Sequence, residues 1–87
     1  MKIAWVDGSR ISVKTDNNEV TISANREGLL SLALQLQALA GGTPGDHIHY
    51  DAYNSLEEGS SEMIVERVDR IGTAGTDVIE RGGEKKP

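Results

Sequence analysis

Apolar and polar residues alternate near the N-terminus with the period of two that is typical of half-buried strands. Three such segments, at residues 3–5, 11–15 and 20–24, are separated by Asp7-Gly8 and by Asp16-Asn17-Asn18. These separators are typical of tight turns, because glycine, asparagine and aspartate tolerate a positive φ. The pattern predicts a meander of three short antiparallel strands.

The spacing of apolar residues then changes to the helical period. Asn25 is a good N-cap, Glu27 lies in the first turn, and Gly41-Gly42 predicts that the helix ends after Ala40. On a helical projection, a stripe of about 120° is expected to cover the sheet. It consists of Leu29, Leu32, Ala33, Leu36, Leu39 and Ala40. Leu30 and Leu34 lie on a second stripe, which is more apolar surface than the core requires.

After the helix, residues 46–51 and 61–68 have the pattern of two further strands, joined by a polar connection at residues 52–60. We therefore expect an α+β domain at residues 1–71. Its predicted architecture is a single antiparallel-rich sheet of about five strands, in the order βββαββ, with one helix packed on one face. Glycine, threonine and charged residues dominate residues 72–87, which predicts a disordered C-terminal tail.

Composition and charge narrow the range of partners. The 87 residues include no cysteine, nine Lys and Arg, and 14 Asp and Glu, which gives a net charge of −5. Without cysteine, the chain forms no disulfide and uses no thiolate chemistry. The acidic balance argues against nucleic acid and against an anionic membrane surface as partners. The first eight residues lack the apolar region of a signal peptide, so we expect a cytoplasmic location.

The run His47-Ile48-His49-Tyr50-Asp51 is the first candidate for chemistry, because His-x-His-x-Asp occurs in metalloenzymes. On a regular strand its three polar side chains share one face, spaced ~6.6–6.8 Å per pair of residues. His47 and Asp51 would then lie ~13 Å apart, too far to bind one ion together unless the strand ends or bulges after His49. The chain has only two histidines, and the spacing indicates no third ligand. A polar surface is therefore favoured over a metal site.

Catalytic groups are not indicated either. Glu57-Glu58 is a carboxylate pair, but acid–base catalysis needs two carboxylates held in different environments, usually in a cleft. No nucleophile elbow and no phosphate-binding glycine loop occur in the sequence. We therefore predict no catalytic residue and no cofactor. Of the aromatic residues, Trp5 and Tyr50 are expected in the core, and Tyr53 is a candidate for an exposed contact.

Four segments occur in a distinctive order along the chain. They are the helix start at residues 24–33, the run His47-Ile48-His49-Tyr50-Asp51, the run Tyr53-Asn54-Ser55-Leu56-Glu57-Glu58-Gly59-Ser60, and residues 62–67. In this combination, the chain from residue 1 to about residue 70 resembles the immunity protein 32 family of bacterial toxin systems. The resemblance implies a protein that binds and inhibits a cognate toxin, without catalysis.

The leading hypothesis is therefore a non-catalytic binding protein that neutralises a toxin by masking a basic site. Its predicted contact surface contains His47, His49, Asp51, Tyr53, Asn54, Glu57 and Glu58. The second hypothesis is a self-associating structural or regulatory domain with Leu30 and Leu34 at the contact. Two leucines alone are too few for a stable dimer, so we expect a monomer or a weak homodimer. A weak metal-binding protein that uses His47 and His49 is a third hypothesis.

Truncation after Ile71 tests the predicted boundary between domain and tail. We expect the thermal midpoint to change by only a few degrees, because the tail has few apolar groups to offset an ordering cost of ~1–2 kcal/mol per residue. Thermal unfolding of the full and truncated chains, followed by circular dichroism, measures the difference. A large loss of stability would show that Val78 and Ile79 pack against the domain.

Overall fold

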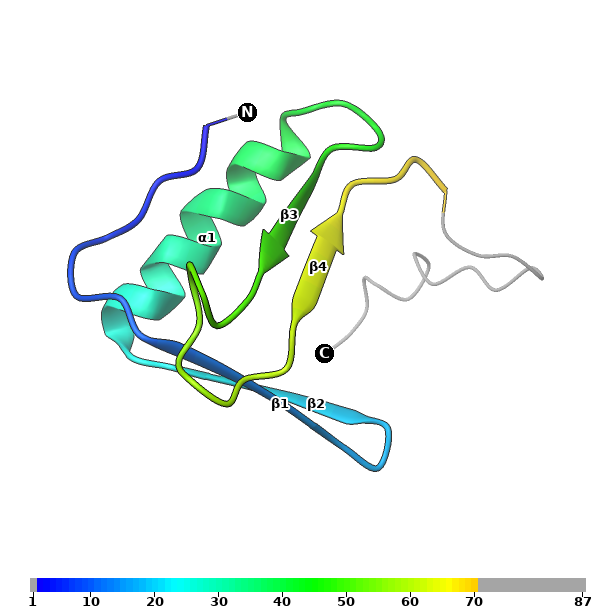
Figure 1. Ribbon diagram of the computed structural model, residues 1–87. Helices are drawn as coiled ribbons and strands as arrows, with labels where there is room; N and C mark the ends of the chain where they lie inside the picture. The colour runs from blue at the N-terminus through cyan, green and yellow to red at the C-terminus, as the bar shows by residue number, and fades with distance from the viewer. Residues whose placement is uncertain (1, 71–87) are drawn as a thin grey trace, which may run out of the picture.

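The computed structural model describes residues 2–70, which form two β-hairpins and one helix (Figure 1). Strands β1 (Ile11–Asp16) and β2 (Glu19–Ala24) form the first hairpin, and helix α1 (Arg26–Ala40) follows directly. Strands β3 (His47–Tyr50) and β4 (Met63–Glu66) form the second hairpin. The tail predicted to be disordered, residues 72–87, lies outside the described residues.

The first hairpin has one polar face and one mainly apolar face. Its strands pair antiparallel, with Val13 opposite Ile22, so these two side chains point to the same side. The turn is made by Asn17 and Asn18, whose φ angles are 51° and 67°. Asparagine tolerates this left-handed conformation better than most residues do. Ile11 and Val13 are buried beneath the rest of the molecule, which lies on this side of the hairpin (Figure 1).

Strand β1 is hydrogen-bonded along both of its edges. On the edge away from β2, the carbonyls of Ile11 and Val13 accept from the backbone N–H groups of Glu57 and Ser61, each at 2.8 Å. Ser60 Oγ accepts a further bond from the Val13 N–H at 3.1 Å. The connection between β3 and β4 is therefore attached to the first hairpin, although it forms no strand there.

The predicted single five-stranded sheet is wrong, because the described residues form two separate two-stranded sheets, β1–β2 and β3–β4. Residues 3–5, which the sequence predicts as a strand, lie beside α1 instead. Val6 N donates to Ser31 Oγ and Ala4 O accepts from Gln35 Nε2, each at 2.8 Å. Since helix side chains satisfy these backbone groups, the segment needs no neighbouring strand. The α+β class is confirmed.

Helix α1 has the predicted ends but turns a different face to the core. Asn25 Oδ1 accepts from Gly28 N at 2.8 Å, as expected of an N-cap. The buried residues are Gly28, Ser31, Gln35 and Leu39. Of the predicted apolar stripe, Leu39 is thus buried, but Leu29 and Leu36 are 54% and 45% exposed. The prediction that this stripe covers the sheet is therefore wrong.

A glycine explains the rotation of the helix. A Cβ atom at position 28 would lie 2.6 Å from the carbonyl oxygen of Arg10 and 2.9 Å from the Ile11 side chain. Only glycine allows α1 to cross the first hairpin this closely. With Gly28 at the contact, Ser31 and Gln35 follow on the same face at helical spacing. Leu32 still packs against the core, whereas Leu29, Leu30, Leu34 and Leu36 are turned away from it.

The core therefore mixes apolar packing with one buried polar pair. Its buried apolar members are Ile11, Val13, Leu39, Ile48, Tyr50 and Leu56. Tyr50 is 1% exposed, as predicted, and its hydroxyl donates to Gln35 Oε1 at 2.7 Å. Burial raises the pKa of Tyr50, so the hydroxyl keeps its proton for this bond. Trp5 is 43% exposed rather than buried, and its ring meets the ring of Tyr50 edge to face.

Replacing Gln35 with alanine should destabilise the protein by about 2–4 kcal/mol, because Tyr50 and Ala4 would lose their partners in a buried site and a cavity would form. Gln37→Ala is the matched control, since Gln37 is an exposed residue of the same helix, and its effect should stay within about 0.5 kcal/mol. Urea unfolding gives both values. Equal effects of the two substitutions would contradict a structural role for the buried amide.

Candidate functional site

The outward face of the second hairpin carries two of the predicted contact residues. His47 and His49 are exposed, and their rings lie edge to face with centroids 4.9 Å apart. The strand register places Glu66 opposite His47 and Ile64 opposite His49, so all four side chains share one face. Ile64 is 60% exposed. We call the set His47, His49, Ile64 and Glu66 the β3–β4 surface.

Asp51 does not extend the histidine face as a regular strand would. Strand β3 ends at Tyr50, and Asp51 Oδ1 accepts from the backbone N–H groups of Tyr53 and Asn54, at 2.9 and 3.1 Å. The carboxylate thus caps the turn that follows the strand. Within residues 2–70, no group of three or more His, Cys, Asp and Glu side chains is placed to hold a metal ion.

Strand β3 also has an open edge. Arg67 N donates to Asp46 O at 2.9 Å, which makes this the first hydrogen-bonded pair of the ladder. By the alternation of antiparallel ladders, Ile48 then bonds to β4, while the backbone groups of His47 and His49 point to the other edge.

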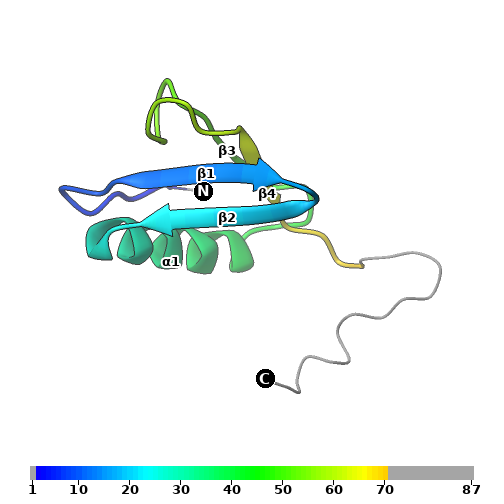
Figure 2. The same ribbon diagram turned by 90° about the horizontal axis from the view of Figure 1, so that it is seen from below.

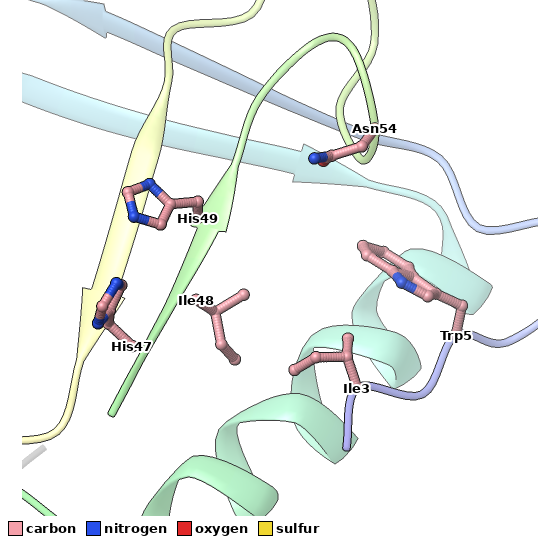
Figure 3. Close-up of a pocket in the computed structure, with 6 residues that line it drawn as sticks. All are labelled: Ile3, Trp5, His47, Ile48, His49 and Asn54. Atoms are coloured by element: carbon pink, nitrogen blue, oxygen red, sulfur yellow. The ribbon is translucent and has the colours of Figure 1, made fainter. Parts of the chain in front are cut away.

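A hollow of about 410 Å³ lies at that edge, between β3 and the N-terminal segment (Figure 3). Its lining residues are Ile3, Trp5, His47, Ile48, His49 and Asn54. In Figure 3, Ile3 and Trp5 extend over α1 on one side of this space, Ile48 extends from β3 on the other, and Asn54 closes one end. The two histidine rings lie on the outer side of the strand. The hollow therefore has apolar walls and a polar rim.

The remaining predicted contact residues lie in the connection after β3. Tyr53 is 96% exposed, and Glu58 is exposed as well. Glu57 is only half-exposed and bonds to Arg10 at 2.8 Å. The hydrogen bond from Arg10 holds the pKa of the Glu57 carboxyl below its ordinary value. Glu57 thus already has a cationic partner within the chain, which makes it a weaker candidate for a partner contact than Glu58.

The structure brings together only part of the predicted set. His47, His49 and Asn54 line the hollow, whereas Asp51, Tyr53, Glu57 and Glu58 are not among its lining residues. Five residues at the site were not predicted as contacts: Ile3, Trp5, Ile48, Ile64 and Glu66. Met63-Ile64-Val65 is an unbroken apolar run, so its alternation gives no signal for which side chain faces outward.

No helix within residues 2–70 is long and apolar enough to cross a membrane. The family model described as Immunity protein 32 matches residues 19–68, which is more than half of the chain. The matched region contains β2, α1, β3 and β4. No curated protein and no solved structure matches the chain.

Zinc addition tests the third hypothesis directly. At a tenfold excess of zinc we expect only weak shifts of the His47 and His49 nuclear magnetic resonance signals and almost no change in stability, because Asp51 is engaged in its turn. Titration with thermal unfolding measures both effects. A stabilisation above ~2.7 kcal/mol would mean tight binding to the native state and would contradict this expectation.

Proposed function

The chain belongs to the immunity protein 32 family, and we propose that it neutralises a cognate toxin by binding it through the β3–β4 surface, the adjoining hollow and the neighbouring exposed Tyr53. The inhibition is steric and electrostatic, with no bond made or broken. The toxin would be met in the cytoplasm. The observation that carries the proposal is the cluster of exposed aromatic and aliphatic groups at this one end of the molecule.

The exposed groups have the chemistry of a protein-binding site. Ile64 is 60% exposed on the β3–β4 surface, and Trp5 is 43% exposed at the edge of the hollow. Tyr53 precedes Asn54 in the turn after β3 and is 96% exposed. Tryptophan and tyrosine contribute disproportionately to binding energy when a partner covers them, because each buries a large area at a low cost in conformational entropy.

The open edge of β3 supports a specific mode of binding. The backbone groups of His47 and His49 are free to pair with an extended segment of the toxin, which would add a strand beside β3. Trp5 and Ile48 then contact alternate side chains of that segment. Backbone pairing supplies affinity, and the walls of the hollow supply selectivity.

Charge favours a basic toxin surface. Glu66 lies beside His47, Asp7 borders a second hollow that shares Trp5 and Asn54 with the first, and the whole chain has a net charge of −5. Complementary charge accelerates association and suppresses binding to other acidic proteins. A toxin site that binds an anionic substrate would carry positive charge, so masking such a site follows from the same complementarity.

Co-production with a candidate cognate toxin tests the proposal. We expect the wild-type chain to restore growth and to bind the purified toxin. Tyr53→Ala and Ile64→Asp should each weaken binding by roughly 30-fold, which corresponds to about 2 kcal/mol for a central contact. Isothermal titration calorimetry measures the affinities.

Thr21→Asp is the control, because Thr21 is exposed on the polar face of the first hairpin, outside the proposed site. It adds the same charge as Ile64→Asp and should leave affinity unchanged. Absence of binding between the wild-type chain and the toxin would refute the function. Binding that none of the site substitutions weakens would retain the function but refute the site.

A further inference from the structure

Helix α1 and strand β2 share a surface that lacks charge to an unusual extent. Between Val20 and Gly45, the only charged residues are Arg26 and Glu27, in a chain in which 26% of residues are charged. An α-helix that faces water normally carries charged residues on its outer side. Helix α1 instead exposes four leucines to between 40% and 54%, namely Leu29, Leu30, Leu34 and Leu36.

Strand β2 adds an open backbone edge to this surface. Asn25 N donates to Arg10 O at 3.1 Å at the base of the hairpin. By the alternation of the ladder, Thr21 and Ser23 bond to β1, while the backbone groups of Val20 and Ile22 point away from it. Six residues of exposed edge with a single charged side chain, Glu19, form a ready template for another strand.

We propose that the free edge of β2 and the leucine-bearing side of α1 form a homodimer interface with a second copy of this chain. The two β2 strands pair antiparallel about a two-fold axis, which gives a continuous four-stranded sheet. Figure 2 shows α1 on the side of β2 away from β1, and Figure 1 shows that α1 starts at the end of β2 and rises away from the hairpin. In the dimer, α1 of each copy covers the apolar side of the partner's β2.

In the monomer, the apolar side of β2 leaves two large apolar side chains exposed to solvent. Val20 and Ile22 point to the same side of the hairpin as Val13 and Ala24, yet they are 59% and 43% exposed. Their positions on an otherwise core-facing side place them where a second helix would bury them. The exposed leucines of α1 lack a cover in the same way, so one symmetric contact accounts for both.

The charge of this surface and the area that it would bury both favour a second copy of the chain, and not a basic protein, as its partner. A β2–β2 pair brings Glu19 of one copy towards Arg26 of the other, because these residues flank the two ends of the strand. The remaining surface is neutral and attracts no basic protein. Fourteen residues contribute, the six of β2 and eight exposed residues of α1. At ~30–40 Å² each, the dimer buries about 1,000 Å² in total, near the lower limit for a specific interface.

Hydrogen exchange on the wild-type chain tests the pairing without any substitution. In a monomer, the amides of Val20 and Ile22 exchange rapidly, because both point to solvent, whereas Thr21 and Ser23 are protected by β1. In the dimer all four are protected, and protection of Val20 and Ile22 is lost on dilution. Rapid exchange at Val20 and Ile22 at about 0.1 mM protein, where a micromolar dimer would be almost fully formed, would overturn the proposal.

Sedimentation equilibrium with substituted chains tests the surface independently. We expect the wild-type chain to sediment as a dimer at about 0.1 mM, and Ile22→Lys and Leu36→Lys each to raise the dimer dissociation constant at least tenfold. Thr43→Lys adds the same charge at an exposed position outside both β2 and α1 and should remain dimeric. Circular dichroism confirms that each variant is folded.

A wild-type monomer, or a dimer that neither substitution weakens, would overturn the proposed interface. This surface is separate from the β3–β4 surface, so the outcome is independent of toxin binding. Loss of toxin affinity by Tyr53→Ala with an intact dimer, and loss of the dimer by Leu36→Lys with intact toxin affinity, are the two results expected together.

Discussion

The buried amide of Gln35 joins three parts of the chain that are far apart in sequence. It donates to Ala4 of the N-terminal segment and accepts from the hydroxyl of Tyr50 on β3, while belonging to α1 itself. One turn earlier, Ser31 accepts from Val6. A buried polar group is tolerated only when its hydrogen bonds are made, so these contacts fix one position for each segment. The hollow beside Trp5 lies between the N-terminal segment and β3, two segments that these contacts fix in place.

The same contacts determine which residues of α1 face the solvent. Gly28 brings α1 against the first hairpin, and the polar residues of the helix then face inward. Leucines occupy the outer side as a consequence. The molecule therefore has two exposed surfaces that contain apolar groups, and they differ in charge and in residue type. One is the β3–β4 surface with its aromatic and acidic groups, which we propose binds a toxin, and the other is the neutral, aliphatic surface of α1 and β2, which we propose binds a second copy of the chain.

Local signals in the sequence were sufficient for the helix and for strands β1 to β4, but not for the N-terminal segment or for the assembly of the elements. Asn25, Asn17 and Asn18 act through their own backbone neighbourhood, so the helix start and the first turn could be predicted. The sheet could not. Whether residues 3–5 pair with a strand or bond to Ser31 and Gln35 depends on contacts about 25–30 residues away, which periodicity does not encode. At the site, His47 and His49 were accessible to prediction as an alternating polar pair, whereas Asp51 left the strand to cap a turn.

The cap of α1 constrains which residues the chain tolerates at position 25. Asn25 uses both ends of its amide: Oδ1 accepts from Gly28 N and Arg10 N, and Nδ2 donates to Gly8 O at 2.9 Å. Aspartate and serine are equally good helix caps in general. Ionised aspartate, however, has no proton to donate and would place a negative charge against the carbonyl of Gly8, and serine is too short to span both sides. The residue at the helix cap is therefore specified by the loop before it, at Gly8, as well as by the helix.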